Sequence, residues 1–186
     1  MNAANDEVSI ADAYHYCPRC AAKNKEIGSV PFRCDECGFA NFFGPVAAVG
    51  GLITNDKGQL LLVRRAVDPG KGKWGLPGGF VDRDETIEDA LEREVYEETK
   101  LVIASRELLM THPNGYRYGG IIVSVIDMFF LCKVSTEDKI HLDRKELSEC
   151  RWVDSDSELF EQMAFESNRI AIERWKSTPL RKTAPP

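Results

Sequence analysis

The chain has 186 residues, of which 43% are hydrophobic and 29% charged, and its formal net charge is −6. Such proportions fit one globular domain with room for a small appendage. No apolar run of about 18 residues could span a membrane, and no basic segment followed by an apolar one suggests a secretory signal. The acidic balance disfavours a nucleic-acid partner, whose phosphates call for clustered Lys and Arg. We therefore expect a cytoplasmic protein.

The N-terminal part of the chain contains two C-x-x-C pairs, formed by Cys17, Cys20, Cys34 and Cys37. Each pair brings two sulfurs within reach of one tetrahedral ion, so two pairs make a four-thiolate cage. Zinc suits this cage because it has no redox chemistry, a rubredoxin-like iron is the alternative, and a pair of disulfides would be reduced in a cytoplasmic protein. We predict a zinc ribbon over residues 14–44, held by structural Zn²⁺ and preceded by flexible residues 1–13.

Beyond the cysteines, apolar stretches alternate with turn signals. Strands are predicted over residues 46–54, 59–67, 101–110, 120–134 and 150–153. Helices are predicted over residues 84–99, 155–163 and 166–176. Loops rich in Gly, Pro and aromatic residues are predicted over 68–80 and 112–120. The irregular alternation of strands and helices favours a mixed α/β layer structure over residues 45–177, with residues 178–186 as a flexible tail.

The segment 82–98 concentrates the negative charge, since nine acidic residues stand against two arginines, a local charge of −7. We expect Asp84 to cap a helix that runs to Thr99, because the segment contains neither Pro nor Gly. On a helical wheel, three acids fall on the exposed side: Glu88, Asp89 and Glu92. Three others continue the apolar stripe of Ile87, Ala90 and Leu91 one turn further along: Glu94, Glu97 and Glu98.

Three converging carboxylates would repel one another and lose hydration unless cations lie between them. Hard oxygen ligands favour Mg²⁺ or Mn²⁺ over Zn²⁺. Nearby basic residues suit anionic phosphates: Arg64, Arg65, Lys71 and Lys73. Because Mg²⁺ held by carboxylates commonly carries substrate phosphates and activates water, the pattern indicates phosphoanhydride hydrolysis.

The same residues fit the Nudix box, G-x(5)-E-x(7)-R-E-U-x-E-E-x-G-U, where U is a bulky aliphatic residue. The matching positions are Gly79, Glu85, Arg93, Glu94, Val95, Glu97, Glu98 and Leu101. Lys100 replaces the second glycine, and a Lys where the helix exit turns left-handed costs about 1 kcal/mol. Together with the preceding WGLPGG, the chain resembles the Nudix hydrolase family over residues 46–176.

This resemblance implies an α/β/α sandwich around a mixed sheet, and a metal-dependent hydrolase of nucleoside diphosphates linked to another group. It implies that Mg²⁺ or Mn²⁺ is held by the carbonyl of Gly79 and by the carboxylates of Glu94, Glu97 and Glu98. One of these carboxylates could act as the base, with Glu94 and Glu97 as the catalytic candidates. Arg93 would pair with Glu85 and orient the helix.

A zinc ribbon ahead of such a domain resembles the NADH pyrophosphatase branch of the family. By the same resemblance, the segment DRKELSECRWV makes Glu146 a fourth carboxylate ligand, and an exposed loop acid is the alternative. The SQPWPFPxS signature of that branch is missing from the sequence, where THPNGYRYGG stands instead. ADP-ribose, FAD or another dinucleotide therefore fits as well as NADH.

The candidates for substrate binding are basic or aromatic residues near the box: Arg64, Arg65, Trp74, Tyr116 and Tyr118. The three aromatic rings could stack on a base or a nicotinamide. Packing, for Trp74, and stabilisation of a turn, for the two tyrosines, are the alternatives.

Two other functions compete with hydrolysis. One is a nucleotide-sensing Nudix domain that binds without hydrolysis and docks partners through its zinc ribbon, but the complete acidic set argues against it. The other is removal of a dinucleotide cap from RNA, with the ribbon as RNA reader, and the few basic residues of the ribbon argue against that. Homodimers occur among similar proteins, although nothing in this sequence demands one.

Overall fold

The computed structural model describes residues 7–135 and 140–178. Residues 1–6 of the expected flexible segment 1–13, and residues 179–186 of the expected tail 178–186, lie outside the described residues. The chain divides into two compact units. The first combines Met1–Val46 with Pro113–Ile126, and the second combines Ala47–His112 with Asp127–Pro186. The division at Val46 lies close to the expected boundary between ribbon and Nudix domain. That Pro113–Ile126 joins the first unit was not indicated by the local sequence.

Three short strands belong to the first unit: β1 (Val8–Ser9), β2 (Phe32–Arg33) and β3 (Ala40–Asn41). β2 and β3 pair antiparallel, and β1 runs parallel to the first residues of β8 (Ile121–Val134). The ring of Tyr14 meets those of Phe32 and Phe43 edge-on, with centroids 5.5 and 4.7 Å away. These rings form a small core next to Cys17 and Cys34.

The expected flexibility of residues 1–13 is wrong for the part that the structure describes. Val8 and Ser9 pair with Ile121 and Ile122, and Ala11 is buried. The edge of a strand presents backbone groups that another segment can satisfy, and here the N-terminal segment does so. The partner strand lies far along the chain, so local composition could not reveal it.

Of the elements in the described residues, the second unit contains the helices and most of the strands. In one sheet, β8 pairs with both β4 (Val46–Ile53) and β7 (Ile103–Tyr118). In the other, β5 (Leu60–Arg65) pairs antiparallel with β6 (Trp74–Gly75) and β9 (Leu147–Val153). The helices are α1 (Ile87–Thr99), α2 (Glu166–Ser177) and the 3-10 helix η1 (Glu158–Gln162), which is shorter than the helix expected over residues 155–163. None of the described helices is both long and apolar enough to cross a bilayer.

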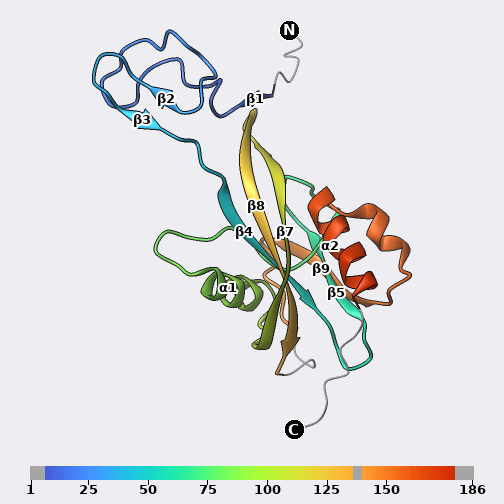
Figure 1. The fold of residues 1–186 in the computed structure, drawn as a ribbon. Coiled ribbons are helices and arrows are strands. Elements are labelled where there is room, and N and C mark those ends of the chain that lie inside the picture. The colour runs from blue at the N-terminus through green and yellow to red at the C-terminus, as the bar shows by residue number, and fades with distance from the viewer. Residues whose placement is uncertain (1–6, 136–139, 179–186) are drawn as a thin grey trace. The chain divides into compact units, whose positions relative to one another are not determined.

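The helices α1 and α2 lie on opposite sides of the strands (Figure 1). Leu60 and Leu62 of β5 pack in one apolar cluster with Ile172 of α2, whereas Leu61 packs in a second cluster with Leu91 of α1. Successive side chains of a strand point to opposite faces, so a strand that is apolar throughout requires cover on both sides. The predicted α/β/α sandwich around a mixed sheet is confirmed.

The expected cap of the acidic helix is wrong. α1 begins at Ile87 and is capped by Thr86, whose hydroxyl accepts a hydrogen bond from the amide of Asp89 at 3.1 Å. Asp84 has a positive φ of 63° and forms part of the turn before the helix. Both residue types can cap a helix, and the path of the preceding loop decided between them.

The loop expected over residues 112–120 is also wrong. β7 continues through Tyr118, and the turn to β8 is made by Gly119 and Gly120, whose φ values of 58° and 80° are both positive. Pro113, which signalled a loop, lies inside β7. Among the described strands, β7 pairs with β8 alone, and a strand at the edge of a sheet tolerates proline.

Candidate functional site

The candidate site is built on the loop 77–81, which leads toward α1. The amide of Val49 in β4 donates a hydrogen bond to the carbonyl of Gly79 at 2.8 Å. A side chain at Gly78 would place its Cβ atom 2.1 Å from the carbonyl oxygen of Val49, and the φ of Gly78 is 145°. Only glycine lets the loop approach the strand this closely, so the pair of glycines fixes the loop against β4.

Arg93 ties this loop to α1. Its Nε and Nη2 donate to the two carboxylate oxygens of Glu85 at 2.8 and 2.9 Å, and Nη2 also donates to the carbonyl of Phe80 at 3.1 Å. Its Nη1 donates to Glu94 at 2.9 Å and to Glu97 at 3.2 Å. These hydrogen bonds lower the pKa of Glu85 and raise the pKa of Arg93. The contact expected between Arg93 and Glu85 is therefore present, in a bidentate form.

Glu98 is the buried acid of the site, with only 6% of its surface exposed. Burial raises its pKa to about 8, and the negative charges of Glu94 and Glu146 act in the same direction. The amide of Gly78, which donates to Glu98 Oε2 at 2.9 Å, and the charge of Arg65 oppose this rise. A carboxyl group whose pKa is raised this far lacks sufficient positive charge around it.

Glu94 and Glu97 differ in their exposure. The side chain of Glu94 is 16% exposed, and that of Glu97 is 58% exposed, so the expected inward position of Glu97 is wrong. Burial raises the pKa of Glu94, with contributions from Glu97 and Glu146, while Arg93 lowers it. The acids predicted for the opposite side of the helix are exposed, as expected: Glu88, Asp89 and Glu92.

Glu146 reaches this group from a distant part of the chain. The segment before β9 is held to the end of α1, because the amides of His141 and Asp143 donate to the carbonyls of Thr99 and Glu98 at 2.9 and 3.0 Å. The charge of Glu146 acts on both Glu94 and Glu98. Glu146 is also exposed and lies in the turn before β9, so both the ligand interpretation and that of an exposed loop acid stay open.

We call Glu94, Glu97, Glu98 and Glu146 the acidic set. By its chemistry this set fits a divalent cation, because it offers hard oxygen donors and unbalanced negative charge. Its oxygens are not drawn together, however. In the described ranges, the four cysteines are the one group of three or more metal-type side chains whose ligand atoms all lie within 4.8 Å of one another. Arg93 holds Glu94 and Glu97, and the carbonyl of Gly79 already accepts one hydrogen bond. The ligand assignments therefore stay predictions.

The two arginines predicted to bind substrate make different contacts. The charge of Arg65 acts on Glu98, while its Nε donates to the carbonyl of Pro69 and its guanidinium lies 5.3 Å from the ring of Phe165. Arg64 lies 3.5 Å from Glu149 and over the ring of Trp74. The register of β5 with β9 shifts between the two arginines, so the simple alternation of strand side chains does not assign their faces.

The predicted aromatic contacts with substrate stay untested, but their surroundings are informative. Trp74 is 3% exposed and belongs to the apolar cluster on the α2 side, which favours the packing interpretation. Tyr116 and Tyr118 lie in the part of β7 that belongs to the first unit, while the acidic set lies in the second. Neither tyrosine stands in the turn that the sequence suggested.

Sequence reasoning missed several residues that support the site. The amide of Gly78 contacts Glu98, and the side-chain oxygen of Asn168 in α2 accepts the amide of Leu76 at 3.1 Å, just before the glycine pair. The ring of Phe165 lies 5.3 Å from the guanidinium of Arg65. The double glycine was a signal for Gly78, whereas nothing local pointed to Asn168 or Phe165.

Lys100 adopts the left-handed conformation that the box glycine would favour, with φ of 61°. Its ammonium group lies 4.8 Å from the centre of the Tyr96 ring, a cation–π contact on the outer side of α1. The substitution therefore keeps the helix exit and removes no carboxylate from the site.

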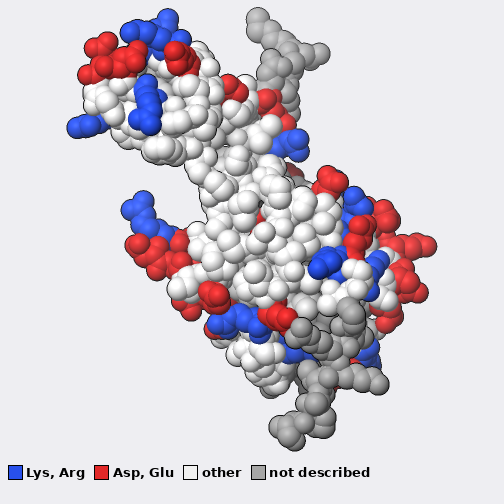
Figure 2. Space-filling view, in the orientation of Figure 1, with Lys and Arg blue, Asp and Glu red and all other residues white. Residues whose placement is uncertain are grey.

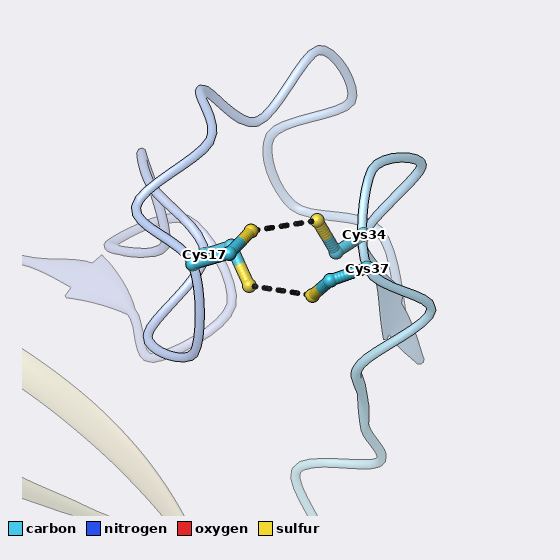
Figure 3. A group of neighbouring side chains, drawn as sticks. Cys17, Cys34 and Cys37 are labelled. Atoms are coloured by element: carbon cyan, nitrogen blue, oxygen red, sulfur yellow. Dashed lines mark hydrogen bonds between the residues drawn. The ribbon is translucent and has the colours of Figure 1, made fainter.

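The four N-terminal cysteines form a second candidate metal centre. Cys17 faces Cys37 with sulfurs 3.7 Å apart, and Cys20 faces Cys34 at 3.6 Å (Figure 3). Four thiolates bound tetrahedrally to one zinc ion lie about 3.8 Å apart, whereas a disulfide needs about 2.05 Å. All four cysteines are free, so their arrangement is compatible with zinc and contradicts the disulfide alternative.

Charges of both signs are interspersed on the face of the molecule seen in Figure 2, over the first unit as well as the second. No large basic patch gathers on that face.

The fold and the box together define a class of protein. The profile of the NUDIX domain matches residues 44–174. The chain belongs to the Nudix hydrolase family, whose acid-anhydride chemistry agrees with the acidic site.

The relatives give a more particular likeness. The ADP-ribose pyrophosphatase of Methanocaldococcus jannaschii is 34% identical over 144 residues, which cover 73% of this chain and 78% of that protein. The MutT NUDIX hydrolase of Burkholderia pseudomallei superposes with a TM-score of 0.61 at 27% identity, over 70% of this chain and 98% of that one. The NUDIX domain of Shewanella oneidensis NrtR, complexed with ADP ribose, gives a TM-score of 0.59 at 26% identity, over 72% and 87%.

Proposed function

We propose that this Nudix hydrolase uses Mg²⁺ or Mn²⁺ to cleave the phosphoanhydride bond of a nucleoside diphosphate linked to another group, with ADP-ribose as the first candidate. A relative named ADP-ribose pyrophosphatase and a similar domain complexed with ADP ribose support this choice. NADH and FAD carry the same diphosphate and are the next candidates.

One observation carries the proposal: Glu98 is 6% exposed, and the charges of Glu94 and Glu146 act on it. Burying a carboxylate beside two others is unfavourable unless cations or substrate compensate for it. A purely structural acidic stripe would leave Glu94 and Glu98 in solvent, where Glu88, Asp89 and Glu92 are found.

In the proposed reaction a water oxygen bonds to one phosphorus, the bond from that phosphorus to the bridging oxygen breaks, and two phosphomonoesters are released. A divalent cation on the carboxylates would neutralise charge at phosphorus and make its bound water more acidic. A carboxylate of the set takes the proton of the water. Arg65 uses its Nε to bond the carbonyl of Pro69, and its terminal amino groups make no hydrogen bond to any described residue. They are therefore suited to a phosphate oxygen.

We also propose that the four cysteines hold a structural Zn²⁺, because their sulfur separations fit a tetrahedral ion and the first unit has a small core. The catalytic cation and the zinc ion then belong to chemically distinct sites, one of oxygens and one of thiolates.

The test is a turnover screen with Mg²⁺ and with Mn²⁺ on ADP-ribose, NADH, NAD⁺ and FAD. Glu94→Gln and Glu98→Gln should each lower turnover by roughly two orders of magnitude or more, because each removes a charge that would hold the cation. Glu88→Gln, on the exposed side of the same helix, is the matched control and should retain activity. Full turnover by both Glu94→Gln and Glu98→Gln would disprove the proposed site.

A further inference from the structure

Arg93 contacts two separate groups through the two edges of its guanidinium. One edge, Nε and Nη2, makes three hydrogen bonds to Glu85 and to the carbonyl of Phe80, all within 3.1 Å. The remaining nitrogen, Nη1, donates to Glu94 at 2.9 Å and to Glu97 at 3.2 Å. The first edge would suffice to orient α1, so the second set of contacts requires its own explanation.

We propose that Arg93 is also the resident counter-cation of the acidic site, and that a divalent cation must take Glu94 and Glu97 over from its Nη1. This inference rests on the proposed metal site. It assigns Arg93 an influence on metal affinity that is opposite in sign to a purely orienting role.

The geometry indicates that Arg93 Nη1 and a divalent cation compete for the same carboxylate oxygens. A carboxylate oxygen bonded to Nη1 has less electron density to offer a cation. Nη1 lies 2.9 Å from the oxygen of Glu94 and 3.2 Å from that of Glu97, so its positive charge would repel a cation bound to the same oxygens. The bidentate contact with Glu85 holds Arg93 in place when the hydrogen bonds from Nη1 to Glu94 and Glu97 break. The carboxylates thus have a partner before the cation arrives, and the helix keeps its orientation afterwards.

The two roles predict opposite effects of removing Arg93. If Arg93 only orients Glu94, its loss misplaces a ligand and weakens metal binding. If Nη1 competes with the cation, its loss strengthens binding by roughly three- to tenfold, the effect expected for one or two partly exposed ion pairs.

The experiment is a titration of the full chain with Mn²⁺, followed by electron paramagnetic resonance, in the wild type, Arg93→Gln and Arg93→Met. Arg83→Met is the matched control, since it removes an exposed positive charge from the turn before α1, and the ion pairs of Glu94 and Glu97 are made with Arg93 instead. We expect tighter binding in both Arg93 variants and a smaller change in the control. Unchanged or weaker binding in folded Arg93 variants would overturn the inference, and so would an equal gain in the control.

A second measurement uses the wild type alone and does not depend on how the variants fold. In ¹⁵N spectra of the arginine side chains, saturating Mg²⁺ should speed the exchange of the Arg93 Nη protons while the Nε–H signal bound to Glu85 persists. Nη signals that do not respond to Mg²⁺ would refute the replacement of Arg93 Nη1 by the cation at Glu94 and Glu97, but they would not argue against the metal site itself. A wild type that binds neither cation would reject the metal site and the inference together.

Discussion

Replacing Glu98 by Gln should stabilise the metal-free protein, although it should abolish activity. Glu98 is 6% exposed, and burial beside Glu94 and Glu146 raises its pKa to about 8. Between its ordinary pKa and this value, the folded state holds a proton that the unfolded state has released. The free energy of unfolding therefore falls as the pH rises through this range, by about 1.4 kcal/mol per pH unit.

The size of the effect follows from the same shift. At pH 7, relative to pH 4 and below, the contribution of Glu98 has lowered the free energy of unfolding by about 3 kcal/mol, and it becomes larger toward pH 8. Gln does not ionise, so the variant lacks this pH-dependent loss of stability. Its side-chain oxygen can still accept the hydrogen bond from the amide of Gly78. The nitrogen of Gln has no assigned partner, and this offsets about 1 kcal/mol of the gain.

The assay is urea denaturation of wild type and Glu98→Gln in EDTA at four pH values from 5 to 8. The difference in unfolding free energy should be small at pH 5 and should grow in favour of the variant toward pH 8. Glu88→Gln is the control for removing an exposed acid from the same helix. With saturating Mg²⁺ the order should reverse, because only the wild type gains from binding the cation. A difference that stays constant from pH 5 to pH 8 would refute the reasoning.

Three further predictions concern the two ends of α1 and the cysteine centre. Lys100→Gly should raise the free energy of unfolding by about 0.5 kcal/mol in urea denaturation, because relief of the left-handed backbone outweighs the lost contact with Tyr96; a loss of stability would contradict this. Thr86→Ala should lower it by about 1 kcal/mol through loss of the cap to Asp89, whereas Thr86→Ser should retain most of the stability. Cys37→Ser should lose the one equivalent of zinc that we expect by elemental analysis of the wild type, while Cys132→Ser should keep it; equal zinc content in the two variants would rule out the thiolate site.

The sequence by itself determined the chemistry of the two candidate centres. Glu94 and Glu98 are four residues apart on one helix, so their common side follows from a local period of 3.6 residues per turn, whereas Glu97 is 58% exposed. The four cysteines are likewise grouped by short spacings within each pair. Such local patterns predict the structure well, because the backbone geometry of a helix or of a C-x-x-C pair is the same wherever that segment lies in the fold.

Only the tertiary structure decided which distant groups join them. Glu146 reaches the acids because its segment hydrogen-bonds to the end of α1, and Asn168 holds the glycine loop from α2. Burial of Trp74 and the pairing of β1 with β8 likewise depend on packing between segments far apart in the chain. Such contacts form because apolar faces are buried away from water and buried backbone groups need hydrogen-bond partners. The local sequence pattern indicates that an apolar face or an unpaired backbone group needs a contact. Packing of the whole chain decides which distant segment provides it.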